Sequence, residues 1–149
     1  MILPITLTIA GAAAILHIWL AVRVSRARRQ LKVSVGDGGN EALLRRIRAH
    51  GNYVENMPFF LILLGLVELA GGDPRILWGI AIAFVLARIT HAFGMDRPSS
   101  SGLRVIGMVT STLLLLGLAG WALSYAYRQP VETRNQIDIG PGRAASLQP

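Results

Sequence analysis

Four polar side chains recur at helical spacing just before an apolar segment. They are Arg45, Arg48, Asn52 and Glu55, and the apolar segment Met57 to Ala70 follows directly. At 100° per residue these positions fall within about 80° of one helix face, and Arg48 to Glu55 spans roughly 10 Å along the axis. One face then presents cations, an amide and a carboxylate. An ionisable residue inside a membrane span is costly and usually faces a bundle interior or a wet cavity, so the pattern indicates a binding site with Glu55 as a candidate.

The elements that must position these side chains are long apolar blocks. Of the 149 residues, 52% are hydrophobic and 15% are charged. A membrane-spanning helix needs about 20 residues. The second block reaches that length only if its helix begins near Asn40 or Glu41, and the third only if it runs on to about Met95. We therefore predict an all-α integral membrane protein, a bundle of four helices built on the apolar blocks 2–22, 57–70, 76–87 and 105–127.

Short polar breaks separate the blocks. Asn40 ends a glycine-rich stretch and is expected to cap the second helix, while Asp73 and Pro74 are expected to start the third. The connection at 71–74 is very short, so the second and third helices should form an antiparallel hairpin. The sequence predicts one transmembrane domain over residues 1–128 and a poorly ordered tail over 129–149.

The net charge of +7 is concentrated between the first and second spans. A basic protein can bind nucleic acid, but cations beside apolar spans are better explained by the positive-inside rule. That rule places this segment in the cytoplasm and both termini on the non-cytoplasmic side, and we expect no nucleic-acid partner. The cations concerned are Arg23, Arg26, Arg28, Arg29, Lys32, Arg45, Arg46 and Arg48.

The chain contains no cysteine. A cysteine nucleophile and thiolate metal ligands are thereby excluded, so any sulfur chemistry must come from a substrate. No spacing of histidines and carboxylates is typical of a metal site, and we expect none.

The segment 48–55 resembles the signature of the MAPEG family, the membrane-associated proteins in eicosanoid and glutathione metabolism. The likeness extends over about residues 10–125, because the basic segment, the Arg88-Ile89-Thr90-His91 sequence and Arg104 follow in the family's order. The chain is similar to a bacterial-type member. The resemblance implies a four-helix subunit, a homotrimer in the bacterial inner membrane, and glutathione bound between subunits near the cytoplasmic surface.

The resemblance also implies which side chains hold glutathione. Arg48, Asn52 and Glu55 would bind the peptide, with Arg28 or Arg29 assisting from the first helix. Arginine suits the two carboxylates of glutathione because its planar fork pairs with them bidentately. The alternative is that Arg48 and Glu55 merely neutralise each other or link helices.

Three histidines and one arginine have both a binding and a structural interpretation. His50, Arg88 and His91 could line the site, and of these three His91 is the one most expected to touch ligand. The alternative is that its imidazole, like the side chains of His17, His50 and Arg88, only hydrogen-bonds across the bundle.

Arg104 is the residue that the resemblance implies for catalysis. In the leukotriene-synthase-like branch an arginine at the start of the fourth helix stabilises the glutathione thiolate, which is the attacking species. The alternative is an interfacial arginine that obeys the topology rule. Val105 follows Arg104 where the prostaglandin E synthase branch has a serine, and Asn56 and Met95 stand where relatives have tyrosines. The expectation is therefore simple thiol activation.

These observations predict a membrane-bound glutathione transferase or peroxidase. Its thiolate would attack a lipophilic electrophile or a lipid hydroperoxide that arrives from the membrane lipid. Two alternatives remain open. One is a non-catalytic lipid-binding or scaffold member of the same fold, and the other is a small transporter, which the gathering of polar residues near one surface disfavours.

Overall fold

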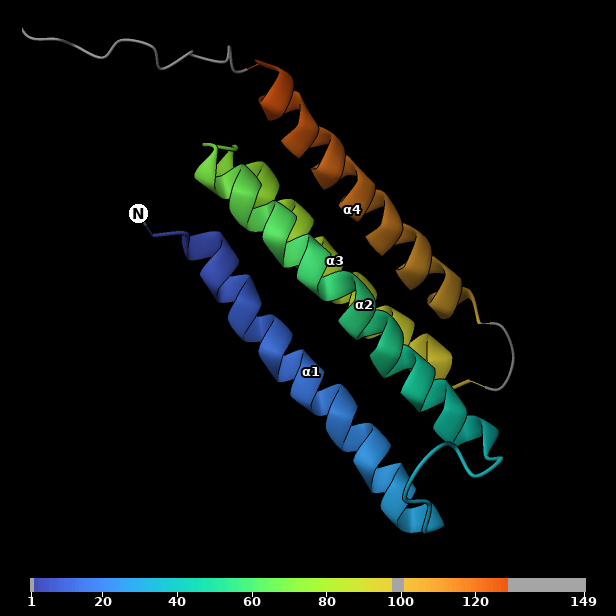
Figure 1. Cartoon of the computed structure of the whole chain (residues 1–149). Coiled ribbons are helices and arrows are strands. Elements are labelled where there is room, and N and C mark those ends of the chain that lie inside the picture. The colour runs from blue at the N-terminus through green and yellow to red at the C-terminus, as the bar shows by residue number, and fades with distance from the viewer. Residues whose placement is uncertain (1, 98–100, 129–149) are drawn as a thin grey trace, which may run out of the picture.

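The computed structural model describes residues 2–97 and 101–128, which form four antiparallel helices (Figure 1). They are α1 (Pro4–Leu31), α2 (Glu41–Leu69), α3 (Pro74–Met95) and α4 (Gly102–Arg128). Each is long and apolar enough to cross a membrane. The predicted all-α four-helix membrane bundle is confirmed, whereas the predicted tail at 129–149 lies outside the described residues.

The capping residues act as their side-chain chemistry predicts. The Asn40 side chain accepts a hydrogen bond from the Leu43 N–H at 3.0 Å, and the Asp73 carboxylate accepts from Arg75 and Ile76 at 2.8 and 3.2 Å. Pro74 occupies the first turn of α3, where its missing N–H costs nothing. The starts of α2 and α3 and the extension of α3 to Met95 are therefore confirmed.

The basic stretch belongs to the first helix, as expected for Arg28 and Arg29. α1 continues through the basic stretch to Leu31, so that Arg23 to Arg29 lie on a helix, and Lys32 ends it in the left-handed conformation with φ 53°. Arginine is a good helix former, and cations near a helix C-terminus interact favourably with the helix dipole. Because both residues lie on α1, the side chains of Arg28 and Arg29 leave the helix in different directions.

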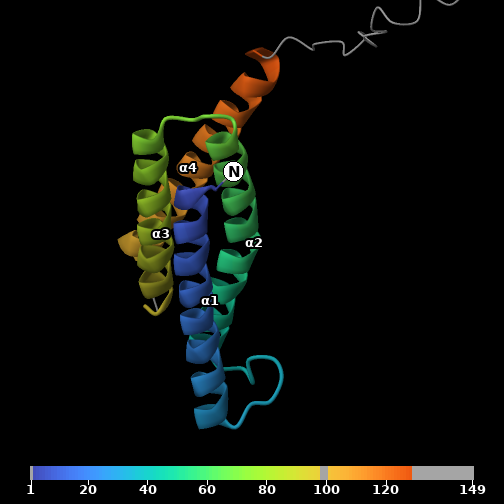
Figure 2. The same cartoon turned by 90° about the vertical axis from the view of Figure 1, so that its left-hand side faces the viewer.

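α1 and α4 lie on opposite sides of the α2–α3 hairpin (Figures 1 and 2). The hairpin is held by buried aromatic and aliphatic side chains, and the stacked rings of Phe60 and Phe84 have centroids 3.7 Å apart. Because α2 contacts each of the other three helices, residues from several helices can lie near its polar face.

Both ends of the bundle are tied by polar contacts. At one end the Glu68 carboxylate, late in α2, accepts hydrogen bonds from the backbone N–H groups of Ile5 and Thr6 at 3.0 and 2.8 Å, and from the Thr6 hydroxyl at 2.6 Å. At the other end Asp96, just after α3, pairs with Arg23 of α1 and with Arg46 of α2. These contacts fix α1 against the hairpin.

Candidate functional site

A pocket of about 780 Å³ opens at the end of the bundle where α2 begins. All four helices contribute to it, together with the loop after α1. The predicted residues Arg28, Arg48, Asn52, Glu55, His91 and Arg104 all line it, with Gly36, Asp37, Leu44, Arg45, Ile47, Gly51, Met95 and Met108. The structure therefore gathers residues separated by up to 80 positions into one cavity.

The two candidate arginines of α1 lie in different surroundings. Arg28 lines the pocket and donates to the Ser34 carbonyl at 3.1 Å. Arg29 is exposed and borders, with Lys32 and Ser34, a separate groove of about 410 Å³ that Arg28 also reaches. Of the pair, the geometry favours Arg28, and Arg29 lies outside the pocket.

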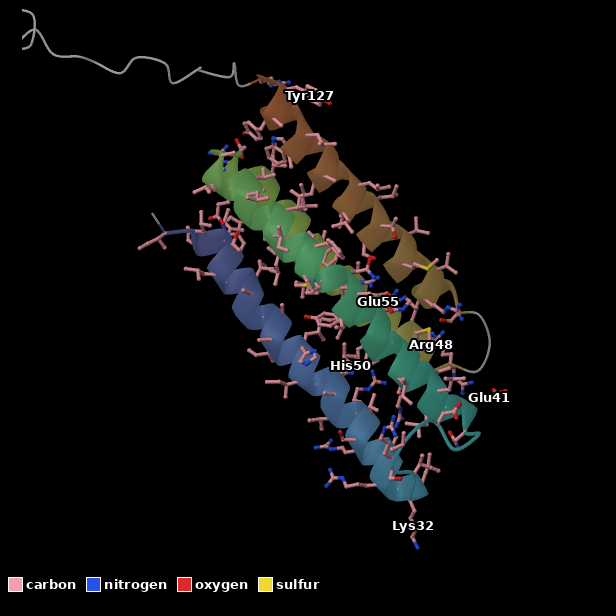
Figure 3. The ribbon with its side chains drawn as sticks, viewed as in Figure 1. Lys32, Glu41, Arg48, His50, Glu55 and Tyr127 are labelled. Atoms are coloured by element: carbon pink, nitrogen blue, oxygen red, sulfur yellow. The ribbon has the colours of Figure 1, made fainter. Side chains whose placement is uncertain are left out.

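The side chains of α2 separate by face. Figure 3 shows Arg48 and Glu55 on the side of α2 toward α4, and His50 on the side toward α1. His50 Nε2 lies 3.2 Å from Nδ1 of His17 in α1. The structural interpretation of His17 and His50 as a hydrogen bond across the bundle is therefore confirmed, and neither lines the pocket.

The charged groups of the pocket are mostly unneutralised. Among residues 2–97 and 101–128, Arg48, Glu55 and Arg104 take part in no ion pair within 4.0 Å, whereas Arg45 pairs with Glu41 at 3.1 Å. The alternative that Arg48 and Glu55 neutralise each other is therefore wrong. Arginines outnumber carboxylates in the lining, which gives a positive cavity suited to an anionic ligand that carries one cationic group.

Asn52 contacts a buried residue, Arg88, for which a purely structural role was also expected. Arg88 of α3 donates to the Asn52 side-chain oxygen at 2.7 Å, and Arg88 is itself only 3% exposed. Its other contacts, to Gly107 and Ser111, reach α4. Arg88 is thus not part of the pocket wall, but it contacts a residue that is.

His91 has one ring nitrogen engaged by the backbone. Its Nδ1 lies 3.2 Å from the Arg104 carbonyl oxygen. A carbonyl can only accept, so Nδ1 carries the proton and, in the neutral ring, Nε2 is left as a hydrogen-bond acceptor. His91 lines the pocket although it is only 6% exposed, and so offers one acceptor among many donors.

Arg104 is positioned by unusually close packing of α3 against α4. A side chain at Gly107 would place its Cβ 2.6 Å from the Ala87 carbonyl oxygen, and one at Gly94 would collide with the Arg104 backbone. The Ser101 hydroxyl donates to the Gly94 carbonyl at 3.0 Å and accepts from the Arg104 N–H at 3.3 Å. Two glycines and a capping serine therefore place Arg104 beside His91.

Part of the pocket wall was not predicted from the amino-acid sequence. Asp37 comes from the loop, and Met108 lies one turn after Arg104 on α4. The i, i+4 spacing was a usable signal for Met108, whereas Asp37 had none. Within the described residues no group of three or more histidines and carboxylates is placed to hold a metal ion.

Known proteins resemble this chain over most of its length. The model of the MAPEG family matches residues 6–124. The chain is 28% identical over 122 residues to the inner membrane protein YecN of Escherichia coli strain K12, which covers 78% of this chain and 93% of that protein. YecN of Escherichia coli O6:H1 strain CFT073 matches with the same identity and coverage. With four membrane-length helices and this match over most of its length, the chain is an integral membrane protein that belongs to the MAPEG family.

Proposed function

We propose that this protein is a membrane-bound glutathione transferase or peroxidase. The observation that carries the proposal is the single pocket that joins Arg28, Arg48, Asn52, Glu55, His91 and Arg104. Glutathione has two carboxylates, one ammonium group, two amides and a thiol. The lining provides guanidinium forks for the carboxylates, Glu55 and Asp37 as partners for the ammonium, and amide and imidazole groups for the peptide.

The cations of the pocket support activation of the thiol. A guanidinium beside sulfur favours the thiolate over the thiol, and the thiolate is the nucleophile. Arg104 is the candidate because it has no ion-pair partner among the described residues and stands where α4 meets α3. In the transferase reaction the thiol proton passes to water, the sulfur bonds to the electrophilic carbon, and the leaving group departs with its electron pair.

The peroxidase reaction uses the same thiolate. Sulfur attacks one oxygen of a hydroperoxide, the O–O bond breaks, and the other oxygen leaves as an alcohol after protonation. A second glutathione reduces the resulting sulfenic acid, giving the disulfide and water. Glutathione is thus the only reductant required.

The apolar part of the wall supports a lipophilic second substrate. Leu44, Ile47, Met95 and Met108 line the same cavity as the charged residues. Thioether side chains are flexible and polarisable, so they adapt to apolar molecules of different shape. A hydrophobic electrophile or hydroperoxide dissolved in the membrane would be in contact with the same helices.

Assembly and orientation are part of the proposal. The polar face of α2 is costly to expose to lipid, so a homotrimer that encloses it is favoured. The basic end of the bundle, which carries the pocket, would lie at the cytoplasmic surface by the positive-inside rule. Native mass spectrometry in mild detergent tests the trimer, and intact activity in a monomer would exclude a site that needs a neighbouring subunit.

The test of function is glutathione titration by calorimetry in detergent, followed by turnover with chlorodinitrobenzene and with cumene hydroperoxide. We expect saturable binding and thiol-dependent turnover with at least one of the two. Arg29→Ala is the matched control for Arg28→Ala, because it also removes a cation from α1 but one that lies outside the pocket. Binding without turnover would favour the non-catalytic alternative, and no binding would refute the proposal.

A further inference from the structure

Arg88 is a buried cation to which the proposed function assigns no role. It lies in α3, is 3% exposed and is not among the residues that line the pocket. Within the described part of the chain it has no carboxylate partner within 4.0 Å. A buried charge without a counter-ion is costly, especially in a membrane-spanning helix. The contacts of Arg88 should therefore explain why a cation is there.

The guanidinium of Arg88 joins three helices. One terminal nitrogen donates to Asn52 Oδ1 on α2 at 2.7 Å. The other donates to the Gly107 carbonyl at 3.3 Å and to the Ser111 hydroxyl, both on α4. The fork thus bridges the α4 backbone and a residue of the pocket wall, and a rigid planar group transmits position more faithfully than a flexible ammonium.

This contact determines which way the Asn52 amide points. A guanidinium can only donate, so the atom of Asn52 that faces it must be the oxygen, and the NH2 group is directed away. That Nδ2 atom has no hydrogen-bond partner among the described residues and is not one of the buried unpartnered atoms. Asn52 lines the pocket, where an NH2 group without a partner among the described residues can donate to a ligand.

We propose that Arg88 is a positioning residue that holds Asn52 as a dedicated hydrogen-bond donor, so that this point of the pocket binds a carbonyl or carboxylate oxygen of the ligand and disfavours a donor such as an ammonium group. Without Arg88 the amide is free to rotate by half a turn and present oxygen instead. The inference rests on the proposed function only for its probe, which is glutathione.

The experiment is a double-mutant cycle on glutathione affinity, measured by calorimetry in detergent. Arg88→Lys keeps a cation but loses the fork, and we expect about tenfold weaker binding. In an Asn52→Ala background the same change should alter affinity less than about twofold, because there is no amide left to orient. The midpoint temperature of thermal unfolding, measured in parallel, should fall with Arg88→Lys in both backgrounds. A loss of affinity in only one background is then due to positioning and not to lower stability.

A second variant tests the donor directly. Asn52→Asp has the same shape, pairs with Arg88 and replaces the NH2 group by an acceptor, so glutathione should bind at least as weakly as to Asn52→Ala. This variant keeps the test decisive if Arg88→Lys does not fold. Arg75→Lys, an exposed position on the same helix at the far end, is the matched control and should bind glutathione as the wild type does.

The outcomes separate the two proposals. Failure of the wild type to bind glutathione overturns both. Wild-type binding with equal effects of Arg88→Lys in both backgrounds supports the glutathione site and overturns the positioning role. Wild-type affinity in Asn52→Asp likewise overturns the assignment of Asn52 as a donor.

Discussion

Two glutamates of α2 make opposite use of a carboxylate in a membrane helix. Glu68 accepts three hydrogen bonds, from the backbone of Ile5 and Thr6 and from the Thr6 hydroxyl. Glu55 accepts none among the described residues and lies exposed at a pocket lined by arginines. The first carboxylate satisfies the N-terminus of α1, whose first N–H groups have no partner within their own helix. Under the proposed function the second carboxylate binds the ammonium group of glutathione.

The function of a charged side chain in a membrane helix depends on the groups that it contacts. Both glutamates are costly in an apolar environment. Helical spacing marked Glu55 as a site candidate, whereas it indicated no partner for Glu68. The end of the bundle with Glu68 and Asp73 has its carboxylates engaged as helix caps. At the other end, Arg48, Glu55 and Arg104 form no ion pair with any residue that the structure describes, as expected for a site that binds a charged ligand.

Among these variants, the largest effect on glutathione binding is expected for Arg48→Ala. Loss of a charge-assisted contact should weaken glutathione binding by about 1.5–3 kcal/mol, or roughly 10- to 150-fold. Calorimetry in detergent measures it, and Glu55→Gln should also weaken binding through loss of the ammonium partner. Unchanged affinity in both folded variants would remove the α2 face from the site.

Arg104→Ala should act on turnover more than on binding. If the guanidinium favours the bound thiolate by one pKa unit, about 1.4 kcal/mol, its loss should lower turnover near neutral pH by about tenfold. Activity should recover as the pH rises toward the pKa of a free thiol, about 8.5, because the thiolate then forms without assistance. Lysine at this position should rescue part of the activity. Identical pH–rate profiles for wild type and variant would show that Arg104 serves the membrane topology and not catalysis.

Glu68→Gln tests the structural half of the comparison. The amide has one oxygen in place of two, so at least one N–H of α1 loses its acceptor, and the free energy of unfolding should fall by about 1–2 kcal/mol. Glutathione affinity should change less than about twofold. Thermal unfolding and calorimetry on the same sample check both statements, and a large loss of affinity with unchanged stability would contradict the assignment.

The smallest effect is expected for Arg29→Ala. This exposed arginine borders the neighbouring groove, and a solvent-exposed cation outside a site contributes little to binding in it. Glutathione affinity should stay within about twofold of the wild type, while Arg28→Ala should weaken it measurably. If Arg29→Ala has the larger effect, the geometric distinction between the two arginines is wrong.

Much of the architecture was predictable from local chemistry. Block lengths predicted four spans, and the side chains of Asn40 and Asp73 marked the starts of α2 and α3 because a short polar oxygen satisfies the first N–H groups of a helix. The 3.6-residue repeat placed Arg45, Arg48, Asn52 and Glu55 on one face, and all four line the pocket. Their contact with glutathione stays a prediction.

Other features had no local signal. The exact end of α1 at Leu31 had no marker, because its basic end lacks the apolar pattern of a span. The sequence left open whether Arg28 or Arg29 faces the site, since that depends on the angle at which α1 meets α2. The partners of Glu68 lie more than 60 residues away along the chain, and no pattern in α2 indicates them.

The spans, the helix caps, the polar face of α2 and the family could be predicted from the amino-acid sequence, because these depend on hydrophobic length, on neighbours within one turn, or on an ordered set of residues. Three features became known only from the packed helices: Arg28 and not Arg29 lines the pocket, Glu68 caps α1 while Glu55 forms no ion pair among the described residues, and Arg88 donates a hydrogen bond to Asn52. These contacts have no signal in the sequence because they act only at short distance. Hydrogen bonds and ion pairs act over a few ångströms, so their partners are known only once the helices are packed.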